Sequence, residues 1–228
     1  MTTFAVRDRS DADGCFLAYA AHELRGSITI QRTLAEVALA DPEADTVALR
    51  QMGAQVAASC ERQERLLEAL LTLARSEFGQ LRREPVDLAE TAAGVLEVHA
   101  PRGLRMITTL EPGRMIGDPE LVERLVANLV SNAIRHNVPG GRLDVATYAA
   151  AGRARLTVAN TGPPIPTGAV PRLFQPFQRL GADTGGARDG VGLGLAIVQA
   201  IADAHDANVN AEARAAGGLR VEIDFQAV

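Results

Sequence analysis

The 228-residue chain is predicted to be an α+β protein in which a long antiparallel helical hairpin precedes an α/β sandwich. Two observations predict this fold class. Through the first third of the chain, apolar residues recur at three- and four-residue steps, which is the spacing of long helices. The remainder alternates strand-like runs with segments that begin at helix-capping residues. With 47% hydrophobic and 22% charged residues, the composition is that of a globular protein and excludes a disordered or collagen-like chain.

The basic residues are all arginine, and the chain contains no lysine. The absence of lysine excludes a P-loop lysine, a Schiff-base lysine and the strand lysine of protein kinases. The net charge of −5 argues against sequence-independent binding to nucleic acid, so we expect no nucleic-acid partner.

Cys15 and Cys60 are too few for a disulfide framework and lack the spacing of a metal site, so we expect two buried thiols in a reducing compartment. No apolar run is long enough to span a bilayer, and the first residues are polar. The segment is therefore expected to be cytoplasmic and not itself inserted in a membrane, although it can still be the inner part of a longer membrane protein.

The N-terminal hairpin is predicted from its apolar spacing. The first helix is expected over residues 12–40 and the second is expected to end near residue 79, with a turn at Asp41-Pro42-Glu43. Gln31 interrupts the apolar stripe of the first helix, whose members are Ala21, Leu24, Ile28, Ala35 and Ala38. The heptad seam of the second helix consists of Leu49, Met52, Val56, Ser59, Gln63, Leu66, Leu70 and Leu73.

Two long helices joined by a short turn cannot bury both of their apolar faces against each other. Pairing with a second copy into a four-helix bundle would bury the remaining faces. The alternative is a hairpin that packs on the rest of its own chain. The heptad spacing favours the dimeric bundle, because it is the spacing of helices that pack on helices.

From Pro85 onward the pattern changes to strands and shorter helices. Asp87 begins a predicted capping box, and Asp118-Pro119 is a second helix start. Helices are expected over residues 87–99, 118–137 and 194–204, and strands over residues 104–110, 142–149, 153–159, 208–214 and 219–226. We expect antiparallel strands with helices on one face. The predicted domains are the hairpin, residues 12–79, and the sandwich, residues 84–228.

The first motif with chemical potential is His22 beside Glu23 in the first helix. Imidazole is a good nucleophile and is partly neutral near pH 7. An adjacent carboxylate can hold one ring nitrogen as N–H, which directs attack through the other nitrogen. The alternative is an ordinary histidine on a solvent-facing side of the helix.

The second motif is NLVSNAIRHN, residues 128–137. Asn128 and Asn132 share one face of the predicted helix because they are four residues apart, and Arg135 follows at the next turn. Two carboxamides and a cation suit ligation of Mg²⁺ and neutralisation of a phosphate. The alternative is a set of solvated side chains, although asparagine is a mediocre helix former.

Two further motifs combine glycine with free backbone groups. Asn160 closes a strand and precedes Gly162 in NTGPPIP, so its carboxamide can read an adenine edge while the backbone approaches closely. An ordinary proline-rich loop is an equal alternative. Gly190, Gly192 and Gly194 lead into a helix whose first backbone N–H groups would suit a phosphate chain.

In this order the motifs resemble those of the sensor histidine kinases of two-component systems. HELRGSI is similar to the phosphoacceptor box, NLVSNAIRHN to the asparagine box, NTGPPIP to the first glycine box, LFQPF to the phenylalanine box and GVGLGL to the second glycine box. The resemblance covers about residues 14–226. It implies a dimerisation and phosphotransfer hairpin, followed by an ATP-binding domain of the GHKL or Bergerat type.

The resemblance also implies roles for individual residues. His22 would receive the γ-phosphoryl group with Glu23 as base, and Asn128 and Asn132 would hold Mg²⁺. The residues implied to bind ATP are Asn128, Asn132, Arg135, His136, Asn160, Gly162, Gly190, Gly192, Gly194 and Leu195. The implied partners are a second copy, through the hairpin, and a response-regulator receiver domain whose aspartate accepts the phosphate. The implied location is cytoplasmic, including the cytoplasmic part of a membrane-anchored sensor.

Four positions depart from the family pattern. Asn160 stands where the family usually has aspartate, and its amide oxygen can still accept from the adenine amine. Pro164 replaces the second glycine of that box. Gly26 stands where the family has threonine or asparagine, and Ser27 where it usually has proline. Because the resemblance places dephosphorylation of the partner on the side chain that Gly26 lacks, we expect weak phosphatase activity.

Two other functions remain open on sequence grounds. One is a serine kinase or ATPase with the same ATP-binding fold, although related ATPases place a water-activating glutamate where Asn128 stands. The other is a degenerate kinase that serves as a dimeric scaffold, which Ser27 and Pro164 suggest. An acid-labile, base-stable phosphate on the protein would separate these alternatives from a histidine kinase.

Overall fold

The computed structural model describes residues 10–41, 45–78, 81–99, 103–178 and 192–228, with the backbone alone for residues 10–23 and parts of the second helix. Gly190, the turn residues Pro42 and Glu43, and the glycine-rich stretch before Gly192 lie outside the described residues. The chain divides into two compact units, residues 2–70 and 71–228. No helix in the described ranges combines the length and the hydrophobicity needed to cross a bilayer.

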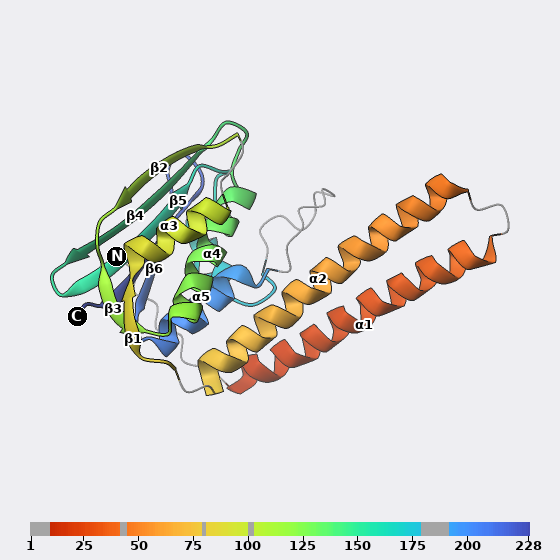
Figure 1. Cartoon of the computed structure of the whole chain (residues 1–228), viewed down its shortest axis with the longest axis horizontal. Helices are drawn as coiled ribbons and strands as arrows, with labels where there is room; N and C mark the ends of the chain where they lie inside the picture. The colour runs from red at the N-terminus through yellow and green to blue at the C-terminus, as the bar shows by residue number, and fades with distance from the viewer. Residues whose placement is uncertain (1–9, 42–44, 79–80, 100–102, 179–191) are drawn as a thin grey trace. The chain divides into compact units, whose positions relative to one another are not determined.

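The hairpin consists of α1, Ser10–Ala40, and α2, Thr46–Phe78 (Figure 1). The predicted seam of α2 is confirmed at Val56, Ser59, Gln63 and Leu66, which are buried or half-buried, but its first member, Leu49, is exposed. On α1, however, Ile28 is 57% exposed. The preceding residue, Ser27, faces α2 instead, because its Oγ lies 2.7 Å from Oγ of Ser59.

The seam between the two helices contains a second polar contact. Nε2 of Gln31, the residue that interrupts the apolar stripe, donates to Oε1 of Gln63 at 3.3 Å. The same Nε2 lies 3.4 Å from Sγ of Cys60. Cys60 is exposed, so the expectation that it is buried was wrong. The side chain of Cys15 lies outside the described residues.

The second unit is built on a five-stranded sheet in the order β2-β4-β5-β7-β6. Its strands are β2, Arg105–Leu110; β4, Arg142–Ala150; β5, Arg153–Asn160; β6, Asn208–Ala213; and β7, Leu219–Gln226. Three helices cover one face of this sheet (Figure 1). They are α3, Leu88–Val98; α4, Pro119–Arg135; and α5, Gly194–Ala204. Two short 3₁₀ turns, η1, Thr167–Ala169, and η2, Pro171–Phe174, precede α5.

The strand pairing differs from the sequence-based expectation in one place. β4, β5, β7 and β6 pair antiparallel as predicted, but β2 is parallel to β4. The chain between these two strands contains α4, and a helical crossover of this kind lets consecutive sheet neighbours run parallel. Two four-residue strands that the sequence did not predict, β1, Glu84–Asp87, and β3, Arg114–Gly117, form a separate antiparallel pair.

The helix α4 follows from its local sequence. Asp118 caps it, with Oδ1 accepting from the backbone N–H groups of Glu120 and Leu121, and Pro119 occupies the first turn. The predicted apolar stripe is buried, with exposed fractions of 3% or less at Leu121, Leu125, Leu129 and Ala133. Burial of this stripe directs the opposite, polar face of α4 away from the core.

Candidate functional site

The polar face of α4 carries two carboxamide side chains, of which one is hydrogen-bonded within the helix and the other makes no such bond to the described residues. Nδ2 of Asn128 donates to the backbone oxygen of Arg124 at 2.8 Å, so this amide is oriented with its oxygen outward. That oxygen lies 3.4 Å from the position a Cβ would take on Gly194. Asn132 is half-buried and makes no side-chain hydrogen bond to the described part of the protein. Both side chains can therefore offer an oxygen to a cation without breaking an internal bond.

The N-terminus of α5 lies beside Asn128. Gly194 is the first residue of α5, and no side chain caps the backbone N–H groups of its first turn. The side chain of Leu195 is buried, so only its backbone is available to a ligand. Gly192 has a φ of +74°, and its oxygen accepts from the backbone N–H of Phe177 at 2.9 Å. An uncapped helix N-terminus attracts phosphate because its N–H groups are free.

Asn160 is buried at the end of β5, where its amide orientation is determined by its neighbours. Nδ2 donates to the backbone oxygens of Thr161 at 2.6 Å and of His136 at 3.4 Å. The reverse orientation would place Oδ1 against two carbonyl oxygens, which is repulsive. The amide oxygen of Asn160 thus has no donor among the described residues, in agreement with the expected acceptor for an amino group.

The loop after β5 is close-packed against two other segments. A Cβ on Gly162 would lie 2.6 Å from the backbone oxygen of His136 at the end of α4. Gly217 and Gly218, in the turn between β6 and β7, have φ values of +89° and +94°. Cβ atoms there would collide with the backbone oxygens of Gly162 and Asn160, respectively. No side chain is tolerated where these three segments meet.

The structure therefore brings the asparagine motif, the NTG loop and the start of α5 into one region of the second unit. Arg135 and His136 are exposed at the end of α4, near the same loop. Gly217 and Gly218, which the sequence indicated only as a turn, support this region. This region offers two carboxamide oxygens on α4 as possible metal ligands, the amide oxygen of Asn160 as a hydrogen-bond acceptor, and the N–H groups at the start of α5 as hydrogen-bond donors. Such a set fits an adenine nucleotide with Mg²⁺.

The phosphoacceptor motif lies on the hairpin. His22 and Glu23 are consecutive residues of α1, and their side chains lie outside those the structure describes. Gly26, one turn further along α1, has no atom within 4 Å of the position that a Cβ would take. The helix α1 continues through Gly26 and Ser27 without a break, although glycine is a poor residue in a helix interior.

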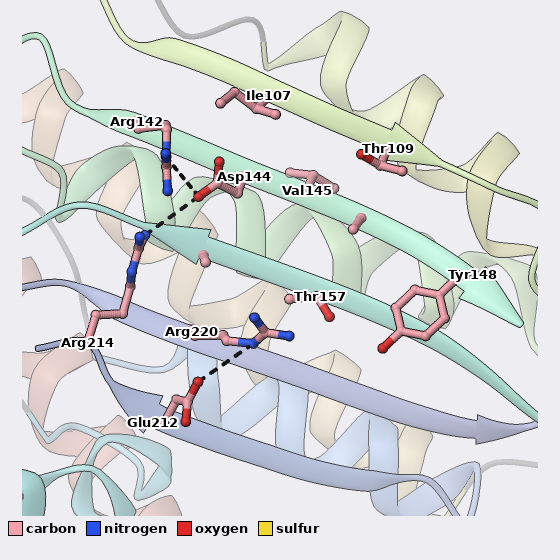
Figure 2. A pocket seen from close by; sticks show the side chains of 12 residues that line it. Ile107, Thr109, Arg142, Asp144, Val145, Tyr148, Thr157, Glu212, Arg214 and Arg220 are labelled. Atoms are coloured by element: carbon pink, nitrogen blue, oxygen red, sulfur yellow. Dashed lines mark hydrogen bonds and ion pairs between the residues drawn. The ribbon is translucent and has the colours of Figure 1, made fainter. Parts of the chain in front are cut away.

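A hollow of about 370 Å³ lies elsewhere, on the sheet face opposite the helices (Figure 2). Its rim carries ion pairs, including Arg142 Nε to Asp144 Oδ2 at 3.0 Å and Arg214 Nη1 to the same oxygen at 3.6 Å. Beside it, the hydrogen bond with Tyr148 raises the pKa of the Arg155 guanidinium, and the Asp224 carboxylate raises it further. None of the predicted nucleotide residues lines this hollow, so we do not assign the nucleotide to it.

Two family models match the sequence. The model described as the His Kinase A (phospho-acceptor) domain matches residues 14–79. The model described as the histidine kinase-, DNA gyrase B-, and HSP90-like ATPase matches residues 117–228. The first range contains His22 and the second contains every residue predicted to bind ATP.

Individual relatives agree with these models. The sensor protein CutS of Streptomyces coelicolor is 45% identical over 213 residues, which are 91% of this chain and 51% of CutS. The mycobacterial sensor histidine kinase MprB is similar in structure with a TM-score of 0.57 and 30% identity, over 64% of this chain and 97% of that one. Histidine kinase ThkA, solved in complex with response regulator protein TrrA, shares the fold with a TM-score of 0.71 and 21% identity, over 97% of this chain and 64% of that one. The chain spans about half the length of CutS.

Proposed function

The chain belongs to the sensor histidine kinases of two-component systems, and we propose that it transfers the γ-phosphoryl group of ATP to His22 and onward to an aspartate of a response-regulator receiver domain. The observation that carries the proposal is the position of Asn128. Its oxygen faces the uncapped start of α5, so a cation held there and a phosphate on the helix would be neighbours.

The nucleotide half of the site would work through positioning and charge neutralisation. Asn128 and Asn132 would hold Mg²⁺, which supplies positive charge to the phosphate oxygens when it is bound. Backbone N–H groups of Gly192, Gly194 and Leu195, together with Gly190, would contact the phosphate chain. At the other end, Oδ1 of Asn160 would accept from the adenine amine beside Gly162. Arg135 and His136 would contribute further phosphate contacts.

The transfer itself needs little covalent chemistry from the protein. A ring nitrogen of His22 attacks the γ-phosphorus, and the bond from that phosphorus to the β–γ bridging oxygen breaks, so that ADP leaves. Glu23 holds the proton of the other ring nitrogen and so orients the nucleophile. The P–N bond then breaks when the aspartate carboxylate of the receiver domain takes over the phosphoryl group.

Two protein partners are part of the proposal. A second copy would cover the apolar side chains that the hairpin exposes, giving a homodimeric four-helix bundle. The receiver partner is supported by family membership and by the fold neighbour ThkA, which forms a complex with a response regulator. We propose residues 12–79 and 84–228 as the two functional domains, and the cytoplasm as their location.

Incubation of the protein with Mg-ATP labelled at the γ-phosphate tests the proposal. We expect a phosphate on the protein that is lost in acid and retained in base, and that passes to a receiver domain on mixing. His22→Ala is the matched control and should remain unlabelled. An acid-stable label would indicate a serine kinase, and ATP hydrolysis or nucleotide binding without labelling would indicate an ATPase or a scaffold. Either result would contradict the proposed function.

A further inference from the structure

His205, a residue to which the proposed transfer assigns no role, joins two of the helices that carry the nucleotide motifs. It follows α5 directly, and its ring Nδ1 lies 2.7 Å from the backbone oxygen of Ile201. On the other side of the ring, Nε2 accepts from the backbone N–H of Asp118 at 3.0 Å. Because a backbone N–H can only donate, Nε2 carries the lone pair and Nδ1 carries the proton. The neutral imidazole therefore bridges the end of α5 and the start of α4.

Both carboxylate oxygens of Asp118 accept hydrogen bonds from the backbone. Its side chain is 3% exposed and caps α4 through Oδ1. Its Oδ2 accepts from the backbone N–H of Arg82 at 3.3 Å. The backbone N–H that His205 accepts lies just outside the helix, where no intrahelical partner exists. The imidazole therefore satisfies a buried donor at the start of α4.

Close packing around the imidazole makes this arrangement specific. A Cβ on Gly117 would meet Cε of Met115 and would lie 2.7 Å from Cδ2 and 2.9 Å from Nε2 of His205. The ring also meets Phe225 edge-on, with 6.2 Å between ring centroids. The imidazole and the Met115 methyl group therefore occupy the space that a side chain at position 117 would need.

The two bridged helices pack against each other in opposite directions. At one end His205 holds the start of α4 against the end of α5, and at the other end Asn128 of α4 faces Gly194 of α5. A displacement of α4 along its axis would move Asn128 and Asn132 relative to the first N–H groups of α5. Those are the groups to which the proposed function assigns the cation and the phosphates.

We propose that His205 is a positioning residue for nucleotide binding, which sets the register of α4 against α5 through its bond to Asp118. This inference rests on the proposed nucleotide site. His99 provides a natural comparison, because it follows α3 as His205 follows α5, and its Nδ1 lies 3.0 Å from the backbone oxygen of Val95. None of the residues proposed to bind the nucleotide lies on α3, and the structure gives Nε2 of His99 no partner among the described residues.

The experiment compares four variants of the full chain, each titrated with ADP and with Mg-ATP by calorimetry well below its unfolding temperature. His205→Leu removes the acceptor and should weaken nucleotide binding about tenfold, equivalent to about 1.4 kcal/mol. His205→Gln offers an amide oxygen at a similar reach and should restore affinity to within about twofold. Gly117→Ala keeps the imidazole but crowds it together with the end of the Met115 side chain, and should weaken binding as His205→Leu does. His99→Leu should bind as the parent does.

The outcomes separate this inference from the proposed function. If the parent binds nucleotide and His205→Leu binds equally well, His205 has only a structural role and the inference is wrong. The same holds if the glutamine variant loses as much affinity as the leucine variant, or if His99→Leu loses as much. Should His205→Leu fail to fold, the comparison of Gly117→Ala with the parent decides in its place. A parent that binds no nucleotide would overturn the proposed function itself.

Discussion

The hairpin and the α/β unit bury their apolar residues to very different extents. In the α/β unit, strands and helices share a closed core in which Leu88, Val122, Leu156, Ile201 and Ile223 are fully buried. The hairpin instead exposes large apolar side chains along both helices. Those described as exposed are Ile28, Ile30, Val37, Leu39, Val47, Leu49, Leu67 and Leu71.

This contrast indicates that the two units differ in how their apolar surface is removed from water. The α/β unit removes its apolar area from water within one chain, which stabilises it by about 25 cal/mol per Å². Two helices alone cannot do so, and the exposed set on the hairpin is the surface that a second copy would cover. The proposed nucleotide site thus lies in a unit with its own closed core, whereas the proposed phosphoacceptor lies in a unit that we propose is completed by a second copy. The following predictions test that division.

The largest effect is expected at the phosphoacceptor. His22→Ala should abolish autophosphorylation, because no other nucleophile replaces the imidazole, and should leave Mg-ATP affinity within a few-fold of the parent. Label incorporation and calorimetric titration measure the two properties separately. Acid-labile labelling of the variant at the parental rate would show that the nucleophile lies elsewhere.

A change at Asn132 in the α/β unit should instead lower the affinity for Mg-ATP. Asn132→Ala removes one proposed oxygen ligand, so Mg-ATP affinity should fall about tenfold or more while the oligomeric state is unchanged. Calorimetry with and without Mg²⁺ checks the affinity, and sedimentation checks the assembly. Ser131→Ala, at the neighbouring position of α4, is the control. Equal Mg-ATP affinity of parent and Asn132→Ala would mean that the metal is held by other groups.

The close packing of the NTG loop gives the next prediction. Gly218→Ala should destabilise the α/β unit and weaken nucleotide binding, because its Cβ would collide with the backbone oxygen of Asn160 at a φ of +94°. Gly152→Ala is a matched control with a φ of +73° and no atom within 4 Å of the added Cβ. Thermal unfolding should show a larger loss for Gly218→Ala. Equal losses would mean that backbone strain alone matters.

The dimer prediction concerns the exposed apolar residues. Ile28→Glu should shift the protein from dimer toward monomer, with the dimer dissociation constant raised about tenfold, since the variant places charge on the proposed interface. Val98→Glu changes a residue of the α/β unit that is 81% exposed, and should leave the assembly unchanged. Sedimentation equilibrium distinguishes the two. If both variants associate as the parent does, the hairpin face around Ile28 is not the dimer interface.

The smallest effect on stability is expected at Gly26. Gly26→Thr adds a side chain where space is open and should stabilise the hairpin by a few tenths of a kcal/mol. It should also raise the rate at which the protein dephosphorylates its receiver partner, since a hydroxyl there would orient the attacking water. Time courses with a phosphorylated receiver domain measure this rate. A parent protein that already dephosphorylates the receiver rapidly, with no gain in the variant, would contradict the prediction.

The sequence by itself determined the helices, the five strands of the main sheet and the motifs, since these depend on residues only a few positions apart. The heptad seam around Ser59, the cap at Asp118 and the start of α5 at Gly194 were all readable from spacing and capping. The order of the motifs also indicated the family before any contact was known.

The tertiary structure decided which distant residues meet. It made β2 parallel to β4, turned Ile28 outward with Ser27 facing α2, placed Gly218 against Asn160, and joined Asp118 to His205 across 87 positions. None of these contacts has a periodic or local signature, because each depends on how complete elements pack. The residue types of the candidate site could therefore be predicted from the sequence, whereas the register between the helices that carry those residues is set by packing.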